Sequence, residues 1–214
     1  MKKSAATLSL ILFTFFSGFA QSKDSEGDGS VAFGIKAGVT FPAFAISGAT
    51  LEGVASSSLT SYYAGVIVDI PIVNALSIQP GLSVIGKGTS LSSAGGTTTK
   101  LTPLYLEIPI NLIVGIPAGP GKFFLGAGPY WALGIVGNVK TTGKGNVDLK
   151  FGSGDTKNLK LTDYGLNFLL GYQLQNGLSI NTGYGLGLTN IQPDAAIDKT
   201  YKSGVFSLGL GFIF

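Results

Sequence analysis

The chain of 214 residues contains no cysteine, no histidine and no arginine. Without cysteine there are no disulfides or thiolate metal sites, and without histidine there are no imidazole ligands or histidine-activated nucleophiles. Charged residues make up only 12% of the chain, about half of the roughly 25% that is usual in globular domains. Most familiar enzyme chemistry is thereby excluded, and we expect neither enzymatic activity nor a cofactor.

Glycine and apolar residues are abundant instead. The chain has 33 glycines and is 45% hydrophobic, whereas glycine accounts for roughly 7% of average sequences. This composition fits neither a disordered chain nor an ordinary soluble domain. The length is compatible with one domain that has a large buried or lipid-facing surface.

The first twenty residues predict a cleaved signal peptide. A short basic start precedes the apolar run Leu8–Phe16, and small residues lead to a cleavage site after Ala20. The run is shorter than the roughly 20 residues that a spanning helix needs. Residues 21–30 are polar and predict a periplasmic lead-in. Loss of Lys2 and Lys3 lowers the formal charge from +3 to nearly zero, so no nucleic-acid partner is expected.

Beyond residue 30, bulky apolar residues alternate with small or polar ones, which places them on opposite faces of a strand. The clearest example is the last, where Phe206, Leu208 and Leu210 alternate with Ser207 and Gly209. Eight stretches follow this rule, at residues 33–40, 62–70, 76–87, 104–115, 122–136, 163–174, 178–189 and 201–214.

The bulky faces of these stretches carry almost no charge, while the opposite faces hold glycine, serine, asparagine and a few charges. A soluble barrel has the reverse arrangement, with large apolar residues inside. A membrane barrel faces lipid with apolar residues, and its closure satisfies the backbone groups that lipid cannot. We therefore predict an all-β fold, an eight-stranded antiparallel up-and-down transmembrane β-barrel over residues 31–214.

Connection lengths support the same fold. Short links at 72–75, 116–121 and 175–177 alternate with long ones, at 42–60, 89–100, 141–160 and 190–200. Outer-membrane barrels have short periplasmic turns and longer external loops. We expect the long links to be flexible, solvated external loops that can contact partners.

Five prolines, Pro71, Pro80, Pro103, Pro109 and Pro129, fall in or beside the expected strands. Proline cannot donate a backbone hydrogen bond and is normally confined to sheet edges, strand starts or bulges. We expect a bulge or a strand end at each of them.

Several short motifs are distinctive in their order and spacing: Phe33-Gly34-Ile35-Lys36-Ala37-Gly38, Ile78-Gln79-Pro80-Gly81-Leu82, Lys87-Gly88, Tyr105-Leu106-Glu107-Ile108-Pro109, Gly126-Ala127-Gly128-Pro129-Tyr130 and the terminal Phe214. Over residues 31–214 they resemble the PorT-like outer-membrane β-barrel family. The resemblance implies an eight-stranded barrel in a Gram-negative outer membrane. It does not by itself imply the founding member's link to type IX secretion, because fold does not fix function.

The apolar residues that end the chain also resemble the signal by which outer-membrane barrels are recognised for assembly. The resemblance implies that the barrel-assembly machinery is a partner. The residues concerned are Phe206, Leu208, Leu210, Phe212 and Phe214.

A set of charged and amide side chains lies on the faces that we expect to line the lumen. Because eight strands enclose only enough space for side chains, we predict a structural network in preference to a channel. A buried unpaired charge is costly, so we expect Lys36 to pair with Glu107 or Asp69. The predicted network comprises Lys36, Asp69, Gln79, Lys87, Glu107, Asn111 and Asp163.

The sequence therefore predicts a small outer-membrane barrel with a structural, assembly or interaction role in the envelope, including a role in secretion. Its expected partners are outer-membrane lipid, the barrel-assembly machinery and other envelope proteins reached through the external loops. One alternative is a narrow pore or small-solute conduit. The other is a secreted, soluble, lipocalin-like barrel with an apolar ligand inside.

Overall fold

The computed structural model describes residues 30–47, 54–93, 95–154, 156–193 and 200–214. The predicted signal peptide and nearly all of the predicted lead-in lie outside these residues. No helix in the described part of the chain is long and apolar enough to cross a membrane.

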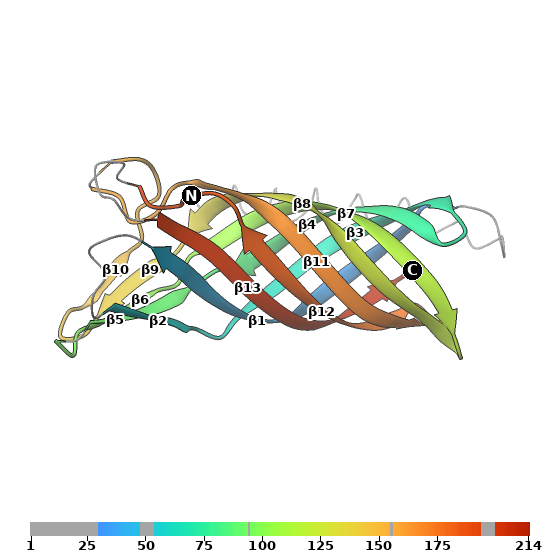
Figure 1. Cartoon of the computed structure of the whole chain (residues 1–214), viewed down its shortest axis with the longest axis horizontal. Helices are drawn as coiled ribbons and strands as arrows, with labels where there is room; N and C mark the ends of the chain where they lie inside the picture. Colours follow the sequence, from blue (N-terminus) through green and yellow to red (C-terminus); the bar gives the residue numbers. More distant parts are fainter. Residues whose placement is uncertain (1–29, 48–53, 94, 155, 194–199) are drawn as a thin grey trace, which may run out of the picture.

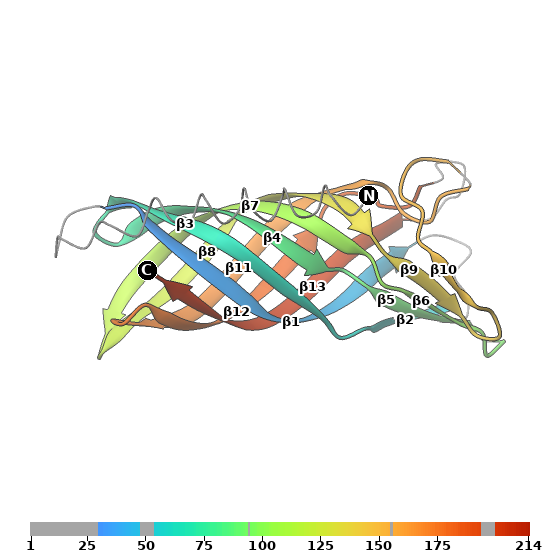
Figure 2. The same cartoon turned by 180° about the vertical axis from the view of Figure 1, so that it is seen from behind.

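Eight antiparallel strands close into a barrel in which neighbours in sequence are neighbours in space and the last strand pairs with the first. The strands run obliquely around the barrel axis (Figures 1 and 2). They are β1 (Ala32–Ser47), β3 (Ser61–Val73), β4 (Leu76–Gly86), β7 (Leu104–Ala118), β8 (Gly121–Val136), β11 (Thr162–Leu174), β12 (Leu178–Gly187) and β13 (Thr200–Ile213). The predicted fold is confirmed.

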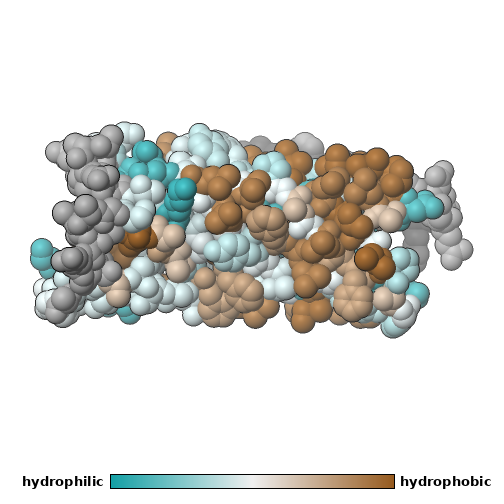
Figure 3. All heavy atoms as spheres, viewed as in Figure 1, coloured by the Kyte–Doolittle hydropathy of each residue, from teal (hydrophilic) through white to brown (hydrophobic). Residues whose placement is uncertain are grey.

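Side chains alternate between the outer surface and the lumen as predicted. In β7, Ile108, Ile110 and Leu112 are exposed, whereas Glu107 and Asn111 are buried. Apolar residues cover much of the outer surface along the barrel, and the end that carries the long loops is more polar (Figure 3). The apolar surface is thus outside and the polar one inside, as lipid requires.

The short and long connections fall at opposite ends of the barrel. Three tight turns join β3 to β4, β7 to β8 and β11 to β12. In the third, Gly177 has a φ of 87°, which suits glycine, and the Leu178 amide donates to Asn176 Oδ1 at 3.1 Å. At the same end, the Phe214 amide donates to the Phe33 carbonyl at 2.8 Å. The predicted alternation of turns and loops is confirmed.

The expectation about proline is correct for only two of the five residues. The register shifts between Pro71 and Val73, and Pro103 lies immediately before β7. The other three, Pro80, Pro109 and Pro129, lie inside strands with no register shift at them. There the ladder omits pairs but keeps its register, because the strand is anchored by regular pairing on both sides of the missing donor.

The long loops are more ordered than predicted. Five short strands form a second antiparallel sheet, hereafter the extension sheet, at the loop end of the barrel (Figure 1). They are β2 (Val54–Ser58), β5 (Thr89–Ser93), β6 (Thr98–Leu101), β9 (Asn138–Thr141) and β10 (Asn146–Asp148). Strand β1 also extends to Ser47, so Pro42 is a buried strand residue and not the start of a loop.

Apolar side chains from these loops meet inside the loop end of the barrel. We call this cluster the lid core. It joins a residue of β1 to residues of the extension sheet, of the loop that precedes β11 and of the loop that follows β12. Its buried members are Phe44, Leu101, Val139, Leu149, Leu159 and Ile191. Burial of this apolar surface explains why polar, glycine-rich loops adopt a fixed arrangement.

Candidate functional site

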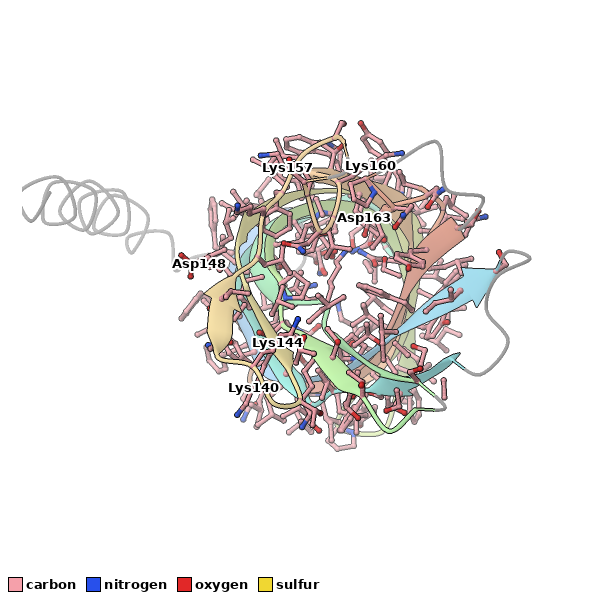
Figure 4. All side chains as sticks on the ribbon, turned by 90° about the vertical axis from the view of Figure 1, so that its left-hand side faces the viewer. Lys140, Lys144, Asp148, Lys157, Lys160 and Asp163 are labelled. Atoms are coloured by element: carbon pink, nitrogen blue, oxygen red, sulfur yellow. The ribbon has the colours of Figure 1, made fainter. Side chains whose placement is uncertain are left out.

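The most highly connected polar group in the lumen is a buried charge cluster. Lys87 follows β4 directly, Glu107 lies in β7 and Asp163 lies in β11. The Lys87 Nζ atom is 2.8 Å from Glu107 Oε2 and 3.0 Å from Asp163 Oδ2. All three side chains are buried. Figure 4, viewed from the loop end, shows Asp163 within the ring of strands.

Two hydroxyl groups complete the coordination of Asp163. The Tyr130 hydroxyl donates to Asp163 Oδ2 at 3.0 Å, and the Ser203 hydroxyl donates to the same atom at 2.8 Å. Lys87 Nζ also lies 3.9 Å from the centre of the Tyr130 ring, a cation–π contact. The cluster therefore links the β4 end to β7, β8, β11 and β13, strands that are distributed around the barrel.

Burial removes these charges from water, which is unfavourable in free energy unless each charge keeps its oppositely charged or hydrogen-bonding partner. One cation faces two carboxylates, which leaves one excess negative charge within the contacts. The Tyr105 hydroxyl and Asp163 Oδ1 are buried and have no hydrogen-bond partner in the described structure. Removing one member of a buried pair typically costs about 3–5 kcal/mol, because the remaining charge stays buried. The cluster thus ties the strands together across the lumen.

The lid core covers the charge cluster on the loop side. Phe151, from the loop between β10 and β11, packs edge-on against the Tyr105 ring with centroids 5.6 Å apart. Phe151 also fills the space that is left by Gly134, where a Cβ atom would overlap its ring. Tyr105 in turn lies beside Tyr130 and Ala132, both of which are buried. Apolar side chains and paired charges together fill this end of the lumen.

Below the charge cluster, toward the short turns, the lumen holds two small cavities. The first, of about 50 Å³, is lined among others by Lys36, Asn111 and Asn181. The second, of about 40 Å³, is lined by Lys36, Asp69 and Gln79 among others. A water molecule needs roughly 10–15 Å³ measured in this way, so each cavity has room for a few waters.

The predicted pairing of Lys36 is wrong. Glu107 pairs with Lys87, and Asp69 accepts hydrogen bonds from Ser77 at 2.7 Å and from Gln79 at 3.5 Å. Among the described residues, Lys36 has no carboxylate within 4.0 Å of its ammonium group. Lys87 reaches Glu107 from the loop end of β4, whereas Lys36 on β1 lines the two cavities instead.

The remaining predicted residues line the lumen without forming one connected network. Asn111 of β7 is buried and lines the first cavity, and its Oδ1 atom has no partner in the described structure. Asp69 and Gln79 lie nearer the short turns, apart from the charge cluster. The five apolar residues near the C-terminus are exposed on the outer surface, and their role in assembly stays a prediction; they are Phe206, Leu208, Leu210, Phe212 and Phe214.

Sequence reasoning missed Tyr130 and Ser203 as partners of Asp163. Both have the lumen-facing parity of their strands, which was the available signal, but nothing in a single sequence brings β8 and β13 to the same carboxylate. The lid core was also missed. Its signal was the isolated bulky residues Phe151, Leu159 and Ile191 within otherwise polar loops.

A closed eight-stranded barrel with an apolar outer surface and a polar, filled lumen defines a transmembrane β-barrel of the outer-membrane class. The family model described as "Outer membrane protein beta-barrel domain" matches residues 19–192. The chain belongs to this family and is located in the outer membrane. This location excludes the soluble, lipocalin-like alternative.

Solved structures are similar in fold. The outer membrane protein OprG from Pseudomonas aeruginosa is 13% identical, with a TM-score of 0.53 over 89% of this chain and 99% of that chain. Neisserial surface protein A is 16% identical, with a TM-score of 0.46 over 86% and 99%. Ail from Yersinia pestis is 10% identical, with a TM-score of 0.45 over 86% and 99%. No curated protein matches the sequence significantly.

Proposed function

We propose that this outer-membrane barrel does not conduct solutes and has a structural or interaction role, with the loop end as the part that meets its partners. The observation that supports it is the double closure of the lumen. The charge cluster of Lys87, Glu107 and Asp163 crosses the lumen between the β4 end, β7 and β11, and the lid core covers it on the loop side. The cavities below, of about 50 and 40 Å³, have room for a few waters and are too small for a solute of metabolite size.

Conductance in planar bilayers tests this proposal against the narrow pore. We expect the wild-type protein to give no channel openings. A double variant, Lys87→Ala with Phe151→Ala, removes the cation of the charge cluster and the ring that packs between Tyr105 and the lid core. It should conduct small ions, which shows that the assay detects an open barrel. If the wild type gives regular channel openings with a conductance similar to that of the double variant, this proposal is wrong and the protein is a narrow pore.

We further propose that the protein is not an enzyme. The whole sequence lacks histidine and cysteine, and the described residues contain no group of three potential metal ligands. The Ser203 hydroxyl donates to a buried carboxylate and is itself buried, so a substrate has no access to it. Incubation of the reconstituted protein with phospholipid and glycolipid should release no fatty acid or headgroup, and turnover that Ser203→Ala abolishes would contradict this.

The finer assignment to PorT-like proteins, with a role beside a secretion or other envelope machine, is also a proposal. Its support is the placement of three proline motifs on the consecutive strands β4, β7 and β8, around Pro80, Pro109 and Pro129. The sequence has no cysteine, so a single cysteine at exposed Gly145 provides a unique crosslinking position in a loop. Capture of envelope proteins by a cysteine at position 145, and not by one at the turn position 119, would support this assignment. Equal capture at both positions would contradict a specific role of the loop end.

A further inference from the structure

Two lysines face each other on the outer side of the extension sheet. Lys100 in β6 and Lys140 in β9 are direct cross-strand partners, and both side chains are exposed. Directly opposed residues have Cβ atoms about 4.5–5.5 Å apart, and like charges in this position are destabilising. Among the described residues, neither ammonium group has a carboxylate within 4.0 Å. The fold therefore holds two cations together without neutralising them.

The opposite side of the same strands fixes the direction in which the pair points. The sequence neighbours Leu101 and Val139 are buried in the lid core. Because side chains alternate along a strand, Lys100 and Lys140 must project away from the lid core. Figure 4 shows Lys140 at the rim of the loop end. The pair belongs to the external surface and is not part of the lumen.

The surface around the lysine pair is polar and rich in hydrogen-bonding groups. Asn146 is the cross-strand partner of Lys140 on β10, and Thr102, Asn138 and Thr142 are exposed at neighbouring positions. One acid, Asp148, lies opposite Asn138, so it flanks the pair diagonally and leaves a net positive charge. Hydroxyl and amide groups beside two ammonium groups suit the oxygens of a phosphate.

The pair also lies close to the lipid-facing surface. β9 continues from β8 after a single residue, and Ile135 near the end of β8 is exposed on the outside. Lys140 is five residues further on, which at about 3.3 Å per residue is at most about 17 Å. Lipid phosphates lie just beyond the hydrocarbon core, and long lysine side chains extend along a surface toward them.

We propose that Lys100 and Lys140 bind the phosphate groups of the outer-leaflet glycolipid that surrounds the barrel. The bound phosphate neutralises the two ammonium groups and thereby relieves the repulsion between them. The site goes beyond the proposed non-conducting role and does not depend on it, since a conducting barrel would carry the same lysine pair.

The test compares lipid retention by two double variants of the full protein purified in detergent. Lys100→Gln with Lys140→Gln removes the pair, and Lys144→Gln with Lys150→Gln removes two exposed lysines elsewhere in the same loops. The probe is lipid A, with and without its phosphates, and retained lipid is counted by native mass spectrometry. Unchanged mobility of unboiled samples on a gel shows that each variant is folded.

We expect the pair variant to bind phosphorylated lipid A about 30-fold more weakly than the wild type, because each lysine near anionic lipid contributes roughly a fivefold factor. The control variant should stay within about threefold of the wild type, and lipid A without phosphates should not distinguish the proteins. Equal losses in both variants would show diffuse charge attraction and overturn the proposal. If millimolar pyrophosphate displaces the lipid and binds more tightly than phosphorylated lipid A, the ligand is a soluble anion and the proposal is also overturned.

Discussion

At the scale of single residues, the lumen lysines Lys87 and Lys36 are in different situations. Lys87 contacts two carboxylates and an aromatic ring, whereas Lys36 lines two cavities without an ion pair among the described residues. The same residue type therefore forms two ion pairs at one position and lines cavities without an ion pair at the other.

This difference predicts the cost of removing each charge. Lys87→Met leaves Glu107 and Asp163 buried together without a cation, and we expect it to lower the free energy of unfolding by about 3–5 kcal/mol. Lys36→Met, the matched control, should change it by less than about 1 kcal/mol. The fraction of heat-modifiable protein on unboiled gels across a urea series measures both. Equal losses would mean that the ion pairs contribute nothing specific.

Gly165 provides a second prediction at this scale. Its position in β11 faces the lumen, and a Cβ atom there would overlap the Leu186 carbonyl and contact the Tyr130 ring. Since Tyr130 donates to Asp163, Gly165→Ala should displace the ring from the carboxylate and destabilise the barrel by about 1–3 kcal/mol. Gly145→Ala, at a loop position with open space around it, is the control. If both variants unfold at the same urea concentration as the wild type, the close packing at Gly165 is not needed.

At the scale of elements, the loop between β10 and β11 contacts the barrel lumen through the Phe151 ring. Phe151→Ala removes the contact with Tyr105 and should lower the local stability of the loop by about 2 kcal/mol. We expect amide hydrogens of residues 149–154 and 156–159 to exchange roughly 30-fold faster, while those of β7 and β8 are unchanged. Val147→Ala, at a side chain that is 60% exposed, should leave exchange unaltered. Loss of protection throughout the barrel would contradict a local role.

The strands and the loops differ in how far the sequence predicts them. Each barrel strand carries its own signal, because period-two alternation repeats along it. Seven of the eight strands were predicted within about three residues at each end, and β1 continues seven residues beyond its predicted end. The extension sheet has no such signal: β5 and β6 are rich in serine and threonine, and they pair because the barrel places their ends side by side. The partners of Lys87 could not be predicted for a similar reason. Alternation along a strand predicts whether a side chain faces the lumen, but it does not predict which side chains of other strands lie at the same height along the barrel axis.

At the scale of the whole molecule, the described structure is closed at the loop end and has its cavities toward the turn end. A single-cysteine series tests which surface faces lipid. Leu208→Cys and Leu210→Cys lie on the outside of β13, and Ser207→Cys, next to Leu208 in the chain, lies on the lumen side. We expect a lipid-soluble maleimide to label the two outer positions at least tenfold faster than Ser207→Cys. Equal rates would contradict the inside-out arrangement.

The outer surface also determines what the only tryptophan of the chain can report. Trp131 projects from β8 on the lipid-facing side, opposite Tyr164 of β11, near the loop end. In a barrel that inserts from the turn side of the membrane, this indole has to cross almost the whole bilayer before it reaches its final depth. Its emission, quenched in turn by lipids brominated at different depths, would therefore follow translocation of the loop end in real time. The unmodified protein thus carries its own probe for the kinetics of membrane insertion.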